Sequence, residues 1–499
     1  SGGVVYDVLT DVNLAGTTKV DDLTVGDDLV VGGDIDLAGS IDVDGTTETD
    51  VLTINGSQLN YKAFGTSSIM FGDTTTGTIS GANYNTGVGI DVFAALTTGD
   101  ENIALGYSAL NDLTTGSSNT AMGSTAGGKI TTGGSNVALG ADSLKNTTTA
   151  SNNTAVGKSA LGANTTGTGN TGLGKEAGGA ITTGDFNTFV GIAGFTTTTA
   201  DNNTAVGYNS MALNTTGTVN TAVGSTALSA NTTAASNTAI GYGALATATT
   251  GGLNTAVGRS ALLDLTTGTP NVAVGAYAGQ SVTTGASNTF IGYQAGDATT
   301  TADGNTAVGR DSLVANTTGA SNTAVGRAAL DANTTASNNT AVGMNSGTAV
   351  TTGASNTYLG AEAGEGNTTH SYNTGIGFRA LEANHSSSDG FNTALGSEAG
   401  KTITGSYNTF LGARSGDATT SGDYTTAVGA DAYGAVGTGS SNTAIGNRAL
   451  YVNTSGADNV AVGRLALGLN TTGGENVAVG KGALDGGTTC EGNVAIGTD

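Results

Sequence analysis

The chain has 499 residues, of which 11% are charged and 5% aromatic, and it contains 84 glycines, one proline, one cysteine and no tryptophan. This composition excludes the leucine- and phenylalanine-rich cores of ordinary multidomain enzymes, and one proline excludes a collagen-like triple helix. The net charge of −24 and the lack of any run of 18 apolar residues argue against nucleic acid as a partner and against membrane insertion.

Residues 1–59 follow a six-residue rule. One apolar series is six residues apart, and a second follows it two residues later: Leu23, Leu29, Ile35, Ile41, and Val25, Val31, Leu37, Val43. Residues at i and i+2 share one face of a strand, so each hexad offers one apolar face. Three chains winding together would close these faces into a β-prism, and we expect this segment to be an attachment or shaft region.

The same segment is strongly acidic, with 12 of the 39 acidic residues of the chain within residues 1–50. Carboxylates at i, i+2 spacing make a weak candidate for calcium: Asp34, Asp36, Asp42 and Asp44. A solvated outer face is the favoured interpretation, because no complete calcium-binding motif is present. We therefore expect no cofactor.

Residues 60–84, with Tyr61, Phe64, Met70 and Phe71, read as a junction to a second repeat, which fills residues 85–499. An asparagine-anchored unit recurs 25 times between Asn85 and Asn493, and 21 of the 24 steps are 17 residues long. The consensus reads N-T-A-V-G-x-x-A-L-x-x-x-T-T-G-x-S, and its residues are numbered here as positions 1 to 17.

A unit of 17 residues is too short for a helical hairpin repeat, and its β-branched residues and glycines favour strands. The sequence predicts an all-β solenoid with one coil per repeat. At a spacing of about 4.8 Å, 25 coils make a rod of roughly 120 Å.

Two positions hold almost without exception. Position 5 is glycine in all 25 copies and position 1 is asparagine in 24, as in the pairs Asn85 and Gly89, Asn254 and Gly258, and Asn459 and Gly463. We expect the glycine at a corner of positive φ and the asparagines in amide ladders along the rod. The Thr-Thr-Gly segment is interpreted as an outward strand and turn.

Apolar pairs recur at positions 3 and 4 and at positions 8 and 9. Neighbouring strand residues point to opposite faces, so two apolar faces imply that both are covered. We expect the outer face to be covered by self-association, most economically as a parallel homotrimer, although a dimer or a lateral sheet would serve the same purpose.

Four aromatic residues replace the small residue of position 3: Phe189, Phe290, Tyr358 and Phe410. In each case the leucine of position 9 is glycine both in that coil and in the preceding coil. Dense packing requires such compensation, so each ring is predicted to occupy the room of two missing leucines.

The histidines, His370 and His385, lie near the 19-residue step, where Ser386 and Asp389 follow His385. A nucleophilic triad needs a histidine held between a serine and a carboxylate. A surface loop that interrupts the rod is the favoured interpretation, and such loops often carry binding. We expect no enzymatic activity.

The Asn-Thr-Ala-Val-Gly-x-x-Ala-Leu unit resembles the head repeats of trimeric autotransporter adhesins, which form trimeric β-rolls. Residues 22–34 are similar to the opening of structural fibre proteins of tailed phages, and residues 493–499 resemble the sequence that precedes a self-cleaving chaperone domain in that family. The resemblance implies a homotrimeric tail fibre or whisker on a virion, joined to other virion proteins at its N-terminal end and facing a host glycan or protein.

Two other functions remain open. A bacterial cell-surface adhesin or extracellular filament would use the same repeat and would place the chain outside the cell. An ice-binding solenoid would show a Thr-x-Thr array in every coil, whereas here the threonines of positions 13 and 14 are adjacent.

Overall fold

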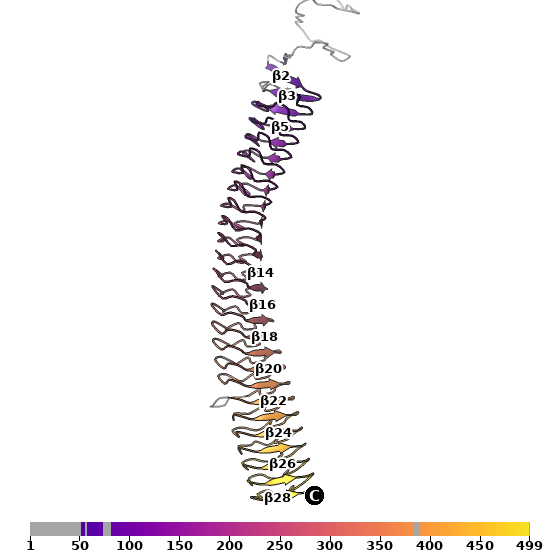
Figure 1. The fold of residues 1–499 in the computed structure, drawn as a ribbon, viewed down its shortest axis with the longest axis vertical. Helices are drawn as coiled ribbons and strands as arrows, with labels where there is room; N and C mark the ends of the chain where they lie inside the picture. The colour runs from indigo at the N-terminus through magenta and orange to yellow at the C-terminus, as the bar shows by residue number, and fades with distance from the viewer. Residues whose placement is uncertain (1–50, 55–56, 73–80, 384–389, 499) are drawn as a thin grey trace, which may run out of the picture. The chain divides into compact units, whose positions relative to one another are not determined.

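The computed structural model describes residues 51–54, 57–72, 81–383 and 390–498, and side chains are described from residue 62 onward. Chain contacts divide the protein into residues 1–48 and 49–499. The hexad segment, its four aspartates and His385 therefore lie outside the described residues. The described part of the second unit is all-β, with no helix, and it forms one stack of short strands (Figure 1).

The described strands run in chain order along this stack: β1 (Val51–Ile54), β2 (Ser57–Phe64), β3 (Ser68–Gly72), β4 (Thr86–Gly89), β5 (Ile103–Leu105), β6 (Thr120–Met122), β7 (Val137–Leu139), β8 (Thr154–Val156), β9 (Thr171–Leu173), β10 (Thr188–Val190), β11 (Thr204–Val206), β12 (Thr221–Val223), β13 (Thr238–Ile240), β14 (Thr255–Val257), β15 (Val272–Val274), β16 (Thr289–Ile291), β17 (Thr306–Val308), β18 (Thr323–Val325), β19 (Thr340–Val342), β20 (Thr357–Leu359), β21 (Thr374–Ile376), β22 (Thr393–Leu395), β23 (Thr409–Leu411), β24 (Thr426–Val428), β25 (Thr443–Ile445), β26 (Val460–Val462), β27 (Val477–Val479) and β28 (Val494–Ile496).

The predicted solenoid with 17-residue coils is confirmed. From β3 onward each strand pairs in parallel with the next, and equivalent repeat positions face each other, as Thr221 faces Thr238. The 16- and 19-residue steps leave this register unchanged, because Thr188 still faces Thr204 and Thr374 still faces Thr393. The irregular lengths are therefore taken up outside the strands. Antiparallel pairs of β1 with β2 and of β2 with β3 precede the stack.

The interior is filled by positions 3, 8 and 9, and the expectation that positions 8 and 9 point to opposite faces is wrong. Ala160 and Leu161 are both fully buried, and neither belongs to a strand. Leu161 has φ near +49°, a left-handed turn conformation that directs its side chain to the same side as Ala160. Of the two apolar pairs, only the one in the strand presents a residue outward, at position 4.

The invariant glycine and asparagine have distinct roles. Gly258 has φ near +140°, and a Cβ there would lie 2.4 Å from the carbonyl oxygen of Gly275 in the next coil. The asparagines form a buried ladder: the backbone amide of Asn102 donates to Oδ1 of Asn85 at 2.9 Å, and Nδ2 of Asn102 donates to the carbonyl of Gly116 at 3.0 Å. Each buried amide side chain thus satisfies backbone groups that the corner leaves open.

The Thr-Thr-Gly segment is a turn, which corrects its interpretation as a strand. The Thr114 hydroxyl donates to the carbonyl of Thr131 in the next coil at 3.0 Å, whereas Thr115 is exposed. Gly116 is buried, and a Cβ there would lie 2.2 Å from the carbonyl oxygen of Gly133. The first threonine therefore joins neighbouring coils, and the second faces solvent. The glycine lets the backbones of two coils approach closely.

The four aromatic rings of position 3 lie between the glycines that replace leucine. A Cβ on Gly400 would come within 2.8 Å of the Phe410 ring, and one on Gly416 within 2.4 Å. Phe189, Phe290 and Tyr358 repeat this geometry with their own pairs of glycines. The four rings belong to separate coils, so each fills its own space rather than joining one continuous stack.

One coil departs from the asparagine ladder, because Thr425 stands at position 1. The Tyr433 hydroxyl, from position 9 of the same coil, donates to the carbonyl of Gly439 at 2.7 Å and accepts from Nδ2 of Asn442 at 3.2 Å. In an ordinary coil an asparagine amide makes these two contacts. The tyrosine therefore replaces the missing asparagine from position 9 of the coil.

Candidate functional site

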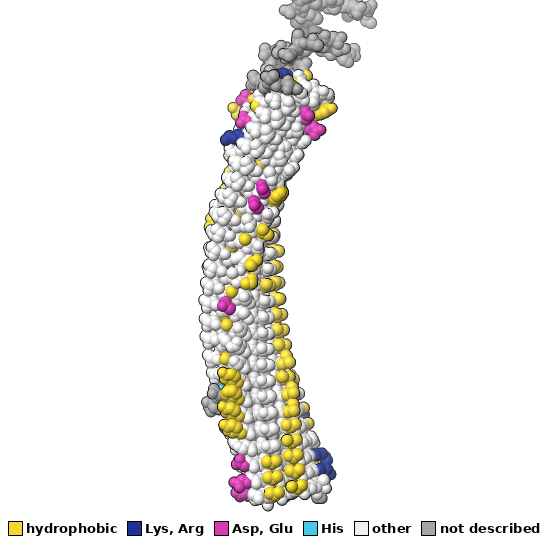
Figure 2. Space-filling view, in the orientation of Figure 1, with side chains coloured by type: hydrophobic (Ala, Val, Ile, Leu, Met, Phe, Trp, Pro, Cys, Tyr) yellow, Lys and Arg dark blue, Asp and Glu magenta, His cyan; other side chains and the backbone are white. Residues whose placement is uncertain are grey.

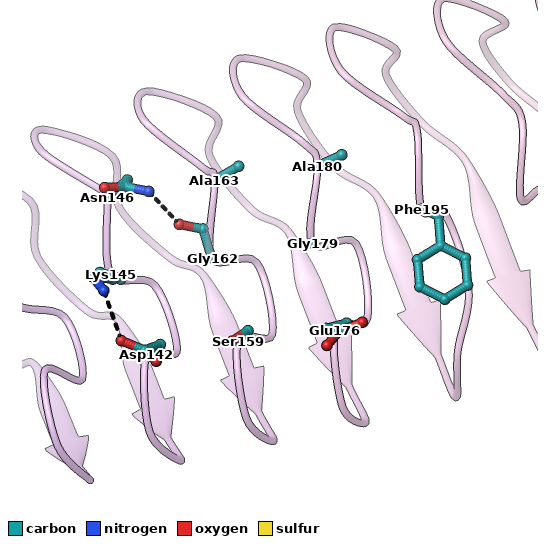
Figure 3. Close-up of a pocket in the computed structure, with 10 residues that line it drawn as sticks. All are labelled: Asp142, Lys145, Asn146, Ser159, Gly162, Ala163, Glu176, Gly179, Ala180 and Phe195. Carbon is teal, nitrogen blue, oxygen red and sulfur yellow. Dashed lines mark hydrogen bonds and ion pairs between the residues drawn. The ribbon is translucent and has the colours of Figure 1, made fainter.

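A hollow of about 470 Å³ lies on the side of the rod formed by positions 7, 10 and 11 (Figure 3). Position 10 is glycine in two consecutive coils, at Gly162 and Gly179, whereas the coils on either side carry Lys145 and Phe195 there. Two missing side chains between two large ones create the depression, and the Phe195 ring stands at one end of it.

The charged and amide side chains of this hollow already have partners in the protein. Asp142 accepts from the Thr125 hydroxyl at 2.7 Å and from Nζ of Lys145 at 2.9 Å, and these hydrogen bonds lower the pKa of its carboxyl group. Nδ2 of Asn146 donates to the carbonyl of Gly162 at 2.8 Å. The hollow is thus an open trough with paired polar walls and one aromatic ring, which suits weak contact with a polar partner.

A cluster of three carboxylates lies further along the same side. Glu362, Glu365 and Glu382 bring oxygen atoms within 4.8 Å of one another, a spacing that a metal ion could use. Burial, followed by the charges of Glu362 and Glu382, raises the pKa of Glu365.

Two cationic side chains form ion pairs with this cluster. Nε of Arg379 lies 2.5 Å from Oε2 of Glu362 and 3.6 Å from Oε1 of Glu382, and Nζ of Lys401 lies 3.5 Å from Oε2 of Glu382. The pairs continue a column of alternating charge at position 7, formed by Glu362, Arg379, Glu398, Arg414, Asp431 and Arg448. The geometry therefore supports an ion-pair network along the rod better than a metal centre.

An aromatic ladder occupies position 17 of four successive coils: Tyr372, Phe391, Tyr407 and Tyr424. Their ring centroids are 4.8 to 5.1 Å apart and the planes lie within 10° of parallel. The four side chains are 40 to 62% exposed. Sequence reasoning missed this ladder, although the residue before four consecutive position-1 anchors is aromatic and could have revealed it.

The strand face, defined here as positions 2 and 4 of β4–β28, extends over the whole repeat. Position 4 is apolar in all 25 coils, being valine, leucine, isoleucine or, once, Met122, and position 2 is threonine, valine or isoleucine. In β5 the middle residue is buried and its two neighbours are exposed, and β6–β27 likewise bury the middle residue between neighbours that are exposed or partly exposed. Figure 2 shows hydrophobic side chains gathered in columns along the rod. The face offers one threonine-rich and one aliphatic column, not the two threonine columns expected of an ice-binding solenoid.

His370 does not lie on a surface loop, which corrects that expectation. It occupies position 15 of its coil and is only 9% exposed, and its carbonyl accepts from Nδ2 of Asn356 at 2.8 Å. Its ring nitrogen Nδ1 lies 3.1 Å from Oδ1 of Asn367. His370 therefore keeps the backbone role that glycine has in most coils.

No protein-family model matches this sequence, and neither a curated protein nor a solved structure shows significant similarity to it. Among the described residues no helix is long and apolar enough to cross a membrane.

Proposed function

We propose that this chain is a structural fibre protein whose solenoid forms the elongated shaft of an appendage, such as the tail fibre or whisker of a virus particle, and supports host attachment. The observation that carries this proposal is the parallel pairing that joins every strand from β4 to β28. A shaft needs length and stiffness, and both follow from coils that repeat the same hydrogen bonds.

The buried ladders explain how such a shaft resists bending and local opening. Every coil connects to the next through strand hydrogen bonds, and most also do so through asparagine amides and threonine hydroxyls. Because each contact spans one coil step, strain at one point is shared by neighbours on both sides. The exposed aromatic ladder and the trough beside Phe195 are surfaces through which the shaft contacts a host glycan or protein.

A bacterial cell-surface adhesin is the second candidate. It is favoured by the exposed aromatic ladder, because four adjacent rings on the side of a rod suit lateral contact with a partner. It differs from the first candidate in where the rod is attached rather than in how the rod is built.

Immunogold electron microscopy with antibodies against residues 85–499 tests the location. Gold on thin appendages of purified virus particles is the expected result, and the same antibodies should give no label on uninfected cells. Label on uninfected cell surfaces would replace the first candidate with the second. Label confined to the cell interior would contradict both.

A further inference from the structure

We infer that the strand face binds a second copy of this chain, parallel and in register. The face carries no charge, and its position-4 column is apolar over the length of the repeat. These position-4 side chains remain partly exposed, 41% for Leu105 and 39% for Ile445. Soluble monomers rarely leave contiguous apolar patches larger than a few hundred Å² open to water.

The spacing of the face identifies its occupant. Apolar side chains recur at position 4 once per coil over 25 coils, and only a partner with the same axial repeat can match every one of them. A second copy of this chain has that repeat by construction. Exposed tyrosines at position 6, such as Tyr107, Tyr208 and Tyr242, add amphipathic anchors along one border of the face.

The two borders carry opposite charge. Position 6 follows each strand and holds seven cations and no acid: Lys158, Lys175, Arg259, Arg310, Arg327, Arg464 and Lys481. Positions 16 and 17 precede each strand and hold nine acids and no cation: Asp100, Glu101, Asp185, Asp201, Asp303, Asp423, Asp458, Glu475 and Glu491. Where charges occur, they are acidic before the strand and basic after it, as around β17, β26 and β27, with no charge at positions 2 and 4 between them.

This polarity fixes the direction of the second copy. Rotation about an axis parallel to the rod leaves each coil at its own height and brings the acidic border of one copy beside the basic border of the other. Rotation about an axis across the face reverses the rod and opposes acid to acid, which is unfavourable. Around β27, the parallel arrangement places Glu475 beside Lys481 of the second copy.

Single cysteines near one end of the rod test direction and register. In a Cys490→Ser background, Val462→Cys lies on the strand face and Thr472→Cys lies on the exposed turn of the same coil. Under mild oxidation we expect Val462→Cys to form a disulfide between two copies, because the same coil of each copy meets at the interface. Thr472→Cys should stay largely uncrosslinked. Equal crosslinking of both variants, or of neither, would overturn the inference.

Charged substitutions on the face test association itself. Native mass spectrometry of the unaltered chain should give two or three chain masses, and a monomer would overturn the inference. Val308→Lys with Val325→Lys should weaken association at least about tenfold, because two charges would be buried without partners. The matched pair Thr318→Lys with Thr335→Lys, on the exposed turn of the same coils, should leave it unchanged. Circular dichroism checks that all variants keep the β-signal, and equal association of the two pairs would contradict the proposed interface.

A monomeric rod would still be compatible with the proposed fibre, so the two proposals fail separately.

Discussion

Two neighbouring coils, those of Asn408 and Thr425, each place an aromatic ring in the interior for a different reason. Phe410 fills space, because Gly400 and Gly416 stand where leucines would otherwise pack. Tyr433 restores hydrogen bonds, because its hydroxyl contacts Gly439 and Asn442 where an asparagine is missing. The coil interior must therefore satisfy two independent conditions, a constant volume and a constant set of polar partners.

The largest expected effect comes from a substitution that changes the volume of the coil interior. Phe410→Ala should lower the local free energy of opening by about 3–5 kcal/mol, since it empties a fully buried site that flanking glycines cannot refill. Adding Gly400→Leu and Gly416→Leu restores the consensus interior, because leucine at position 9 adopts a similar φ, near +49° in Leu450. We expect the triple variant to recover most of the loss, measured by amide hydrogen exchange. A triple variant less stable than Phe410→Ala would contradict the compensation.

A smaller effect is expected from a substitution that removes a buried hydrogen-bonding group but keeps the volume. Tyr433→Phe should cost about 1–3 kcal/mol of stability, because the carbonyl of Gly439 would lose the hydroxyl that donates to it while the ring volume is kept. Converting the coil to consensus with Thr425→Asn and Tyr433→Leu together should recover stability, whereas Tyr433→Leu alone should not. Hydrogen exchange in β24 and β25 measures both. Equal stability of Tyr433→Phe and the unaltered chain would show that the hydroxyl has no such role.

The smallest effect lies on the surface of the same region. Burial raises the pKa of Asp417 in the folded state, so ionisation of this carboxyl group opposes folding. Well below pH about 3.9 the carboxyl group is neutral in both the folded and the unfolded state. The protein loses stability as pH rises from there through the folded-state pKa. Asp417→Asn should raise the thermal midpoint by about 1 °C at pH 7 and leave it unchanged at pH 3. Asp431→Asn, which removes ion pairs to Arg414 and Arg448, should not raise it. A gain for Asp417→Asn that persists at pH 3 would contradict this origin.

The repeat made the solenoid, its coil length and the ring-for-leucine exchange predictable, since periodicity and volume are visible in the sequence. The direction of Leu161 was not predictable, because a left-handed turn outside the strand places it beside Ala160. The role of Tyr433 was hidden because its partners come from other positions of the coil. The aromatic ladder was overlooked because position 17 has no fixed residue type in the other coils, as Glu101, Gly169 and Val219 show.

The most direct test of the account is cryo-electron microscopy of the purified chain. Residues 85–499 should appear as a rod roughly 120 Å long with an axial repeat of about 4.8 Å. Density for stacked coils in register along that rod would support a shaft built from 25 equivalent coils. A compact particle, or a rod without the 4.8 Å repeat, would contradict it.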